Sequence, residues 1–173
     1  MRKKFDTFGV MIDMSRNAVM SMDALKRFLP LLKKMGYNCV MLYTEDTYEI
    51  DGEPYFGYMR GRYTKAEMKE LDAFAASLGM TMIPCVQTLA HLNATVRWNQ
   101  LPRDYGDILM IDDERTYEFI DRMFATLSEC FGRAATQKHT SYEPRHCGRH
   151  GAPPHHGKSA RSLERQRNHA KGG

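Results

Sequence analysis

The last 42 residues of this 173-residue chain lack nearly all the side chains from which a hydrophobic core is built. Residues 132–173 contain no Val, Ile, Met, Phe or Trp and a single Leu. They carry nine Lys or Arg against two Asp or Glu, whereas residues 1–131 carry 16 against 19. A segment of this composition cannot bury enough apolar surface to offset the entropy of ordering its backbone. We therefore expect residues 1–131 to fold and residues 132–173 to form a disordered basic tail.

Cysteines are few, and long apolar runs are missing. The four cysteines, Cys39, Cys85, Cys130 and Cys147, are 46, 45 and 17 residues apart, which matches no zinc-ribbon or zinc-finger spacing. No stretch approaches the ~20 apolar residues of a membrane span. The apolar run after the basic start, Val10–Ile12, is too short for a signal peptide. We expect free thiols in a reducing compartment, a cytoplasmic location and no membrane partner.

Two binding functions can be considered for the tail, and neither is favoured. Thiolate and imidazole groups suit zinc, but two prolines and no predicted secondary structure separate the candidates Cys147, His150, His155 and His156. The nine basic residues could contact phosphates non-specifically, but no aromatic interleaving or recognised module accompanies them. We expect no metal, no cofactor and no nucleic-acid partner.

Three short, nearly continuous apolar segments predict buried parallel strands. They are Phe8–Met14, Cys39–Tyr43 and Met80–Val86. A helical pattern follows each strand. Asp113 can cap the third of these helices, whose predicted buried face comprises Thr116, Tyr117, Ile120, Phe124 and Leu127.

Local signals define the ends of the first two helices. Thr64 and Glu67 form a capping box at the start of the second helix, and Gly36 and Gly79 are placed to end the first and second. Pro30 lies inside the first helix and predicts a kink there. Alternating strands and helices of this kind predict a parallel sheet with right-handed crossovers.

Polar residues at the ends of the strands separate the two parallel architectures, a doubly wound sheet and a barrel. Each strand is followed at its carboxyl end by such residues: Asp13 and Arg16, Glu45 and Asp46, Gln87 and His91. Barrel enzymes build their sites at this face. The first strand–helix turn also lacks the Gly-rich phosphate loop of a nucleotide-binding sheet. We predict an α/β fold, an incomplete TIM (β/α)8 barrel made of its first three βα units.

Four segments carry a resemblance to a known family. They are Gly9–Asn17 (Gly-Val-Met-Ile-Asp-Met-Ser-Arg-Asn), Leu42–Glu49, Gly57–Tyr63 and Ile83–His91. In this order they resemble glycoside hydrolase family 20, the β-N-acetylhexosaminidases, over about residues 5 to 131. The resemblance implies removal of terminal β-linked N-acetylglucosamine or N-acetylgalactosamine from a carbohydrate. It also implies substrate assistance, in which the acetamido oxygen of the sugar attacks the anomeric carbon.

The same resemblance implies an adjacent Asp-Glu pair after the fourth strand, where the Asp orients the acetamido group and the Glu protonates the leaving oxygen. No such pair follows Phe131, since the only later acids are Glu143 and Glu164. We expect a truncated, inactive chain, and hypothesise a shift of reading frame near Phe131 or Gly132. Three strands of eight would also leave open sheet edges and an uncovered apolar interior. The alternatives are a non-catalytic carbohydrate-binding or interaction fragment and another TIM-barrel glycosidase.

The resemblance also assigns supporting residues. His91 matches a family histidine that pairs with an upstream carboxylate, here Glu45 or Asp46, and supports the catalytic acid; without the resemblance it would be an ordinary loop residue. Substrate contacts are expected from Asp13, Arg16, Gln87, Arg60 and Trp98. An ion pair between Arg16 and Asp13 with a purely structural role is an equal alternative.

Two further features bear on sugar recognition. Classical family members carry a sugar-binding Arg where this chain has Phe8, so Arg16, Arg60 or Arg62 would have to supply the missing donor. Aromatic rings can stack on the apolar face of a pyranose or simply pack within the loop. The candidates are Tyr43, Tyr48, Tyr55, Phe56, Tyr58 and Trp98.

Overall fold

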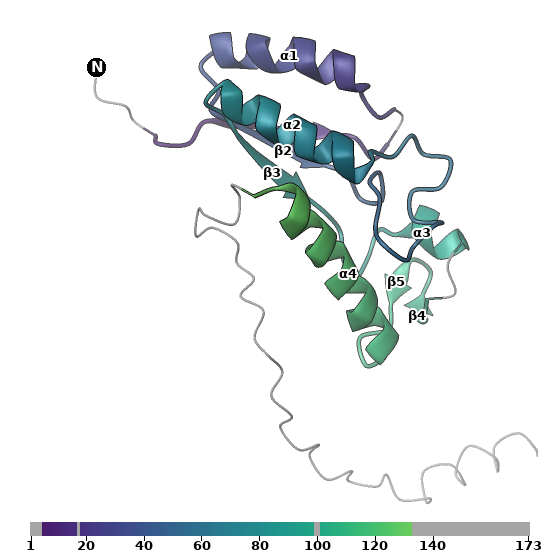
Figure 1. Cartoon of the computed structure of the whole chain (residues 1–173). Helices are drawn as coiled ribbons and strands as arrows, with labels where there is room; N and C mark the ends of the chain where they lie inside the picture. Colours follow the sequence, from purple (N-terminus) through teal and green to yellow (C-terminus); the bar gives the residue numbers. More distant parts are fainter. Residues whose placement is uncertain (1–4, 17, 99–100, 133–173) are drawn as a thin grey trace, which may run out of the picture. The chain divides into compact units, whose positions relative to one another are not determined.

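The computed structural model describes residues 5–16, 18–98 and 101–132. Its elements, in chain order, are β1 (Gly9–Asp13), α1 (Met22–Lys34), β2 (Cys39–Tyr43), α2 (Lys65–Ser77), β3 (Thr81–Cys85), α3 (Asn93–Trp98), β4 (Arg103–Tyr105), β5 (Ile108–Leu109) and α4 (Glu114–Cys130) (Figure 1). Residues 133–173 lie outside the described part, so the expected tail at 132–173 stays a prediction.

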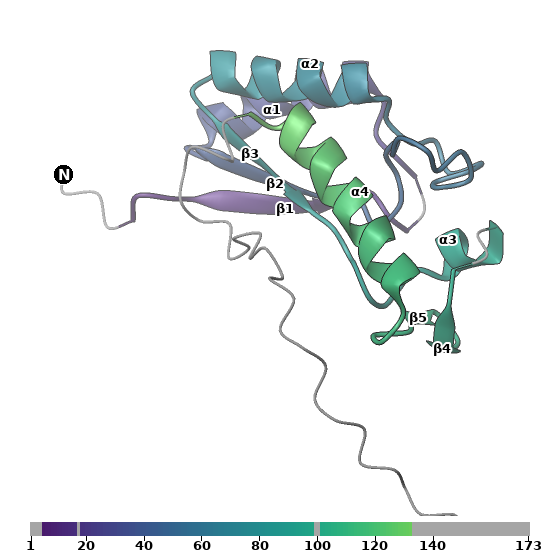
Figure 2. The ribbon, with the colours of Figure 1, turned by 60° about the horizontal axis from the view of Figure 1, so that its bottom comes forward.

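The three predicted strands form one parallel sheet in the order β1-β2-β3. Their pairing aligns Gly9 with Cys39 and Thr81 at one end, and Asp13 with Tyr43 and Cys85 at the other. Figure 2 shows α1 and α2 on one side of this sheet. The side chains beneath them are buried: Val40, Leu42 and Met82. The mixed α/β fold with parallel strands is therefore confirmed.

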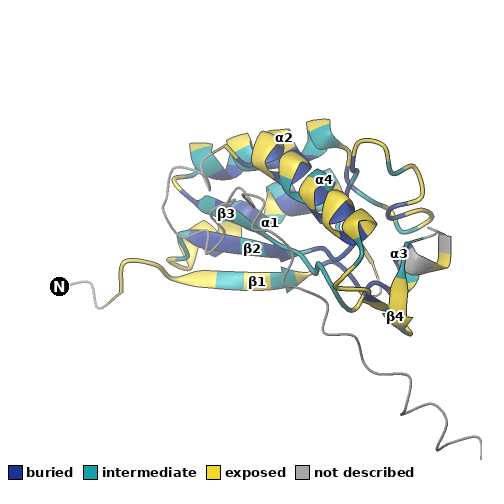
Figure 3. Cartoon of the chain, turned by 90° about the horizontal axis from the view of Figure 1, so that it is seen from below, coloured by how far each residue is buried: buried dark blue, intermediate teal, exposed yellow. Residues whose placement is uncertain are grey.

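The opposite face of the sheet is much more open to solvent. Met11, Met41 and Ile83 form a row across it, because the register places these three residues side by side. Met41 and Ile83 are only half-buried, and Met11 is exposed. Figure 3 shows that much of β1, the edge strand that carries Met11, is exposed. The sheet thus has one well-packed face and one apolar face without full cover.

The helix boundaries follow the predicted signals. Thr64 Oγ1 accepts a hydrogen bond from the Glu67 amide at 3.2 Å, and Glu67 Oε2 accepts one from the Thr64 amide at 2.8 Å, so the capping box is confirmed. α1 continues through Pro30 to Lys34 and is followed by Gly36 at a φ of 96°. That backbone conformation favours glycine and ends the helix.

The predicted face of the last helix is partly wrong. Tyr117 is 48% exposed, whereas Phe119 and Met123 are fully buried in α4. The Phe119 ring packs edge-on against Phe56, 5.7 Å between ring centres. α4 therefore packs against the loop after β2 through Phe119, a contact that a helical period alone could not reveal. α3 and the β4–β5 hairpin were not predicted, because elements of two to six residues carry too little periodicity.

The long loop between β2 and α2 is packed. Tyr48 and Phe56 are fully buried, with their rings 5.0 Å apart and edge to face. These two rings cannot stack on a sugar, so for them the packing alternative is correct. Tyr55 and Tyr58 are exposed, at 49% and 43%. Gly57 has a φ of 67°, and a Cβ there would lie 2.1 Å from the Asp46 carbonyl oxygen.

Candidate functional site

The carboxyl ends of the three strands bring the expected polar residues to one edge of the sheet. Since Asp13, Tyr43 and Cys85 are level in the sheet, the segments that follow them begin side by side. Arg16, Glu45 and Gln87 lie on these three segments. These three residues therefore lie close together because the strands are parallel and their ends are level.

A chain of hydrogen bonds links these segments. Gln87 Nε2 donates to Tyr43 Oη at 2.9 Å, and Tyr43 Oη donates to Glu45 Oε1 at 3.1 Å. Arg16 Nη1 donates to the same Glu45 oxygen at 2.9 Å, while Arg16 Nε lies 4.0 Å from Asp13 Oδ2. Residues that follow all three strands are therefore in direct contact.

Arg60 connects this chain to a second carboxylate. Its Nε lies 3.0 Å from Asp46 Oδ1, its Nη2 lies 3.9 Å from Glu45 Oε2, and it donates to the Ser15 carbonyl. Thr95 Oγ1 donates to Asp46 Oδ2 at 3.2 Å. The contact between Arg60 and Asp46 is an ion pair without hydrogen-bond geometry, since Oδ1 accepts no hydrogen bond within the described residues. Arg60 therefore ties the loop after β2 to the loop after β1.

Glu45 occupies an unusual backbone conformation. Its φ is 47°, in the left-handed region that residues other than glycine rarely adopt, and its side chain is only 7% exposed. His91 has a φ of 60°. Such conformations persist only where surrounding contacts enforce them, and they concentrate at functional sites. The two positions nominated from the sequence are thus also two of the strained positions in the fold.

The electrostatics of the carboxylates differ. Burial raises the pKa of Asp46, while the charge of Arg60 and the hydrogen bond from Thr95 oppose the rise. Hydrogen bonds from the side chain and amide of Ser15 lower the pKa of Asp13. The charged form of the buried Asp46 carboxylate therefore depends on Arg60 and Thr95, whereas hydrogen bonds from Ser15 stabilise the charged form of Asp13.

Tyr43 also titrates abnormally. Burial raises the pKa of its phenol most, and the hydrogen bond to the Glu45 carboxylate raises it further, while the bond from Gln87 lowers it. The phenol consequently stays protonated and acts as a donor to Glu45.

The remaining candidate residues do not take part in these contacts within the described residues. His91 is exposed in the turn after β3, and within the described residues it makes no hydrogen bond or ion pair with Glu45 or Asp46. Trp98 ends α3, and its side chain is outside the described part of the structure. Arg62 is turned toward the Pro54 and Phe56 carbonyls.

Phe8 marks the opposite end of β1 from the site. It stacks on Tyr37, with ring centres 4.4 Å apart and planes 6° from parallel. Of the three arginines considered as replacements for the donor missing at this position, only Arg16 and Arg60 reach the polar edge. Arg60 already binds Asp46 and Ser15, and Arg16 remains 61% exposed on its side chain.

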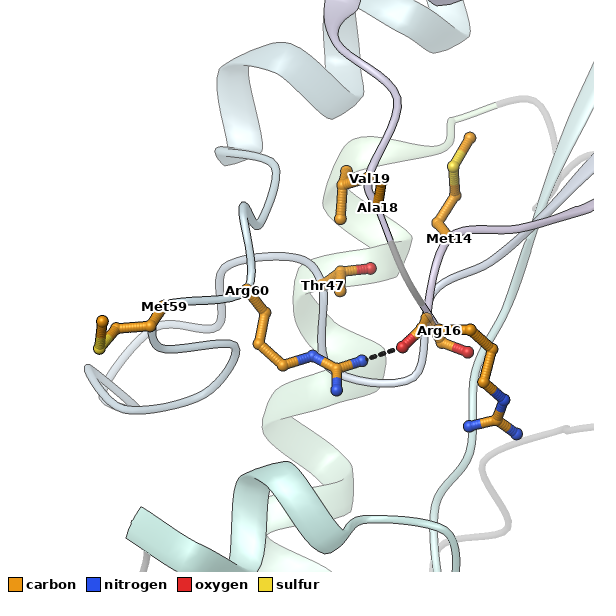
Figure 4. A pocket seen from close by; sticks show the side chains of 8 residues that line it. Met14, Arg16, Ala18, Val19, Thr47, Met59 and Arg60 are labelled. Carbon is orange, nitrogen blue, oxygen red and sulfur yellow. Dashed lines mark hydrogen bonds between the residues drawn. The ribbon is translucent and has the colours of Figure 1, made fainter.

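A pocket of 210 Å³ opens beside Arg16 and Arg60, and Figure 4 shows the side chains around it. Arg60 donates a hydrogen bond to the Ser15 carbonyl, whereas the Arg16 side chain points away from Arg60. The other lining residues are Met14, Ala18, Val19, Thr47 and Met59. Sequence reasoning missed Ser15, Tyr43 as a hydrogen-bonding group, and Thr95, because each is chemically ordinary and gains its role only through folding.

Neither a metal centre nor a membrane segment is found in the described ranges. Residues 5–16, 18–98 and 101–132 hold no cluster of three or more His, Cys, Asp or Glu that could bind a metal ion. Across the same ranges, every helix is too short or too polar to cross a bilayer.

Comparison with known proteins identifies the fold. No protein-family model and no curated protein matches the chain. The solved β-N-acetylhexosaminidase of glycoside hydrolase family 20 from Streptomyces coelicolor A3(2) is 26% identical, with a TM-score of 0.64; the match covers 74% of this chain and 31% of that one. A mutant Streptomyces plicatus β-hexosaminidase in complex with the product GlcNAc is also 26% identical, with a TM-score of 0.62, covering 72% of this chain and 30% of that one.

A more distant structure shares the same fold. The exo-β-N-acetylglucosaminidase from Vibrio harveyi is 21% identical, with a TM-score of 0.64, and the match covers 75% of this chain and 26% of that one. The chain thus spans less than a third of the length of each of these three structures. The resemblance to glycoside hydrolase family 20 that the sequence motifs indicate is therefore confirmed in three dimensions.

Proposed function

We propose that residues 5–131 are the first three βα units of a β-N-acetylhexosaminidase barrel, and that their polar edge is part of its sugar pocket. The ligand would be a terminal β-linked N-acetylglucosamine or N-acetylgalactosamine. One observation carries the proposal: hydrogen bonds run from Gln87 through Tyr43 and Glu45 to Arg16, across the carboxyl ends of three parallel strands. Barrel enzymes place their substrates at this end.

Arg16 is the residue that we assign to the sugar hydroxyls. Its guanidinium has a fixed fork of donors, of which one binds Glu45 and another faces Asp13. The exposed part of the side chain leaves donors for a ligand. Arg60, which donates to the Ser15 carbonyl and forms an ion pair with the buried Asp46, is assigned to hold the loop.

Asp46 is the better candidate for the carboxylate that supports His91. Thr95, which binds Asp46, lies four residues after His91 on the segment that leaves β3. Asp46 is therefore already connected to that segment, whereas Glu45 faces Arg16 on the other side.

Catalysis requires a proton donor that residues 132–173 do not offer, because neither Glu143 nor Glu164 follows an Asp. We therefore propose that this chain binds the sugar without hydrolysing it, and that a shift of reading frame near Phe131 accounts for the change in composition. Translation of the downstream DNA in its other frames tests the second point. A strand ending in Asp-Glu is the expected result, and its absence from every frame would refute the frameshift.

The binding proposal is tested by NMR titration of the chain with N-acetylglucosamine and N-acetylgalactosamine, with glucose as the control ligand. We expect binding of an N-acetylated sugar, weaker binding after Arg16→Ala, and no release of nitrophenol from a chromogenic β-N-acetylglucosaminide. Turnover would overturn the proposed inactivity. Preference for glucose would instead favour another TIM-barrel glycosidase, and binding to none of the three would leave an interaction fragment without a sugar site.

A further inference from the structure

We infer that Tyr43 and Gln87 are positioning residues that hold the Glu45 carboxylate, and through it Arg16, in the orientation that receives the sugar. The inference rests on the proposed sugar site and extends it to Tyr43 and Gln87. It gives Gln87 a positioning role in place of the substrate contact expected from the sequence, because its amide donates to Tyr43.

The Tyr43 hydroxyl is already fully engaged in hydrogen bonds within the protein. It accepts from Gln87 Nε2 and donates to Glu45 Oε1, so both of its hydrogen-bonding functions are used. Because the phenol has only one hydrogen, acceptance from Gln87 directs that hydrogen to Glu45. The amide of Gln87 therefore fixes which way the Tyr43 hydroxyl points.

Glu45 needs this support. Its backbone φ of 47° is held by the surrounding structure, and its nearly buried carboxylate receives donors from two sides, Tyr43 and Arg16, at one oxygen. Loss of the Tyr43 donor would free that oxygen to rotate toward Arg60, whose Nη2 lies 3.9 Å from the other carboxylate oxygen. Arg16 would then lose its fixed partner.

The effect would reach the ligand through Arg16. A flexible, exposed arginine loses rotamer freedom when it binds, and a side chain that is already held loses less. Asp13, at 4.0 Å from Arg16 Nε, is too distant to hold the guanidinium alone. Tyr43 and Gln87 would thus increase sugar affinity without contributing a contact.

The test measures the dissociation constant for N-acetylglucosamine or N-acetylgalactosamine by NMR titration of the full chain. Tyr43→Phe and Gln87→Glu keep the side-chain volume while removing the hydroxyl or the amide donor. We expect each to weaken binding by roughly 2- to 10-fold, the range of one hydrogen bond. Tyr37→Phe is the matched control, because Tyr37 stacks on Phe8 at the other end of the strands, and it should bind as the unsubstituted chain does.

A double-substitution cycle separates positioning from a general loss of structure. If Tyr43 acts through Arg16, Tyr43→Phe should have no further effect on affinity once Arg16→Ala is present. Additive losses, or unchanged affinity in Tyr43→Phe and Gln87→Glu, would overturn the inference while the proposed function stands. If the unsubstituted chain binds neither N-acetylated sugar, the proposed function fails, and this role fails with it.

Discussion

Arg16 Nη1 lies 2.9 Å from Glu45 Oε1, and the two partners differ strongly in exposure: 61% of the arginine side chain is accessible against 7% of the glutamate. Removal of the arginine and removal of the glutamate should therefore change the stability of the fold by different amounts. Ion pairs with an exposed partner contribute little to stability, whereas a nearly buried carboxylate leaves several donors unmatched when it is lost.

The first prediction follows from this asymmetry. Arg16→Ala should change the free energy of unfolding by less than about 1 kcal/mol. Glu45→Ala should lower it by about 1–3 kcal/mol, because the Tyr43 hydroxyl and the Arg16 guanidinium lose their acceptor. Urea unfolding followed by circular dichroism measures both values, with Arg27→Ala on the exposed side of α1 as the control for losing a surface arginine. Equal effects at positions 16 and 45 would contradict the asymmetry.

The second prediction concerns Gly57. Gly57→Ala should cost about 3 kcal/mol or more of unfolding free energy, since its φ is 67° and the new Cβ would meet the Asp46 carbonyl oxygen at 2.1 Å. Gly106→Ala is a close control: its φ is 56° and no atom lies within 4 Å of the added Cβ, so only the backbone cost of about 1 kcal/mol is expected. Similar losses at both positions would show that the close approach to Asp46 is unimportant.

The third prediction is a pH dependence at Asp46. Its pKa is raised above the ordinary 3.8 by burial, so the folded state binds the proton more tightly than the unfolded state does. The contribution of Asp46 to stability therefore falls as the pH rises from 3.8 through its raised pKa. Compared with Asp46→Asn in urea unfolding, the unsubstituted protein should be relatively more stable near pH 4 than near pH 7. A difference that grows toward pH 7 would mean that the ion pair with Arg60 outweighs burial.

The fourth prediction concerns the open face of the sheet. Met11 and Leu31 are both 53% exposed, but Met11 belongs to the row with Met41 and Ile83, whereas Leu31 lies on α1. Met11→Lys should reduce binding of the dye ANS and self-association in light scattering more than Leu31→Lys does, because it interrupts a continuous apolar row. Equal reductions would show that the face does not act as one surface.

Much of the framework could be predicted from the sequence because its signals are local. The capping box at Thr64, the αL glycine Gly36 and the apolar run Cys39–Tyr43 each depend on neighbouring residues, and each was found where predicted. The polar edge could also be predicted, since parallel strands bring their carboxyl ends together. These features need no knowledge of long-range packing.

Other features depend on contacts that no local pattern encodes. The burial of Phe119 rather than Tyr117 follows from contact with Phe56, more than sixty residues earlier. The bond from Thr95 to Asp46 joins segments 49 residues apart. An ordinary threonine or phenylalanine gains such a partner only when the chain folds, so the sequence could suggest the location of the site but not its internal connections.

The chain of polar contacts from Gln87 to Arg16 also requires the observed alignment of the strands. Side chains alternate between the two faces of a strand, so sliding β2 by one residue would turn Tyr43 toward α1 and α2 and remove it from Gln87. The buried side chains Val40, Leu42 and Met82 favour the same alignment, because the slip would move the two from β2 to the open face. The hydrogen bonds that define the proposed sugar site therefore also oppose a shift of the strands, and a substitution that removes them should weaken both.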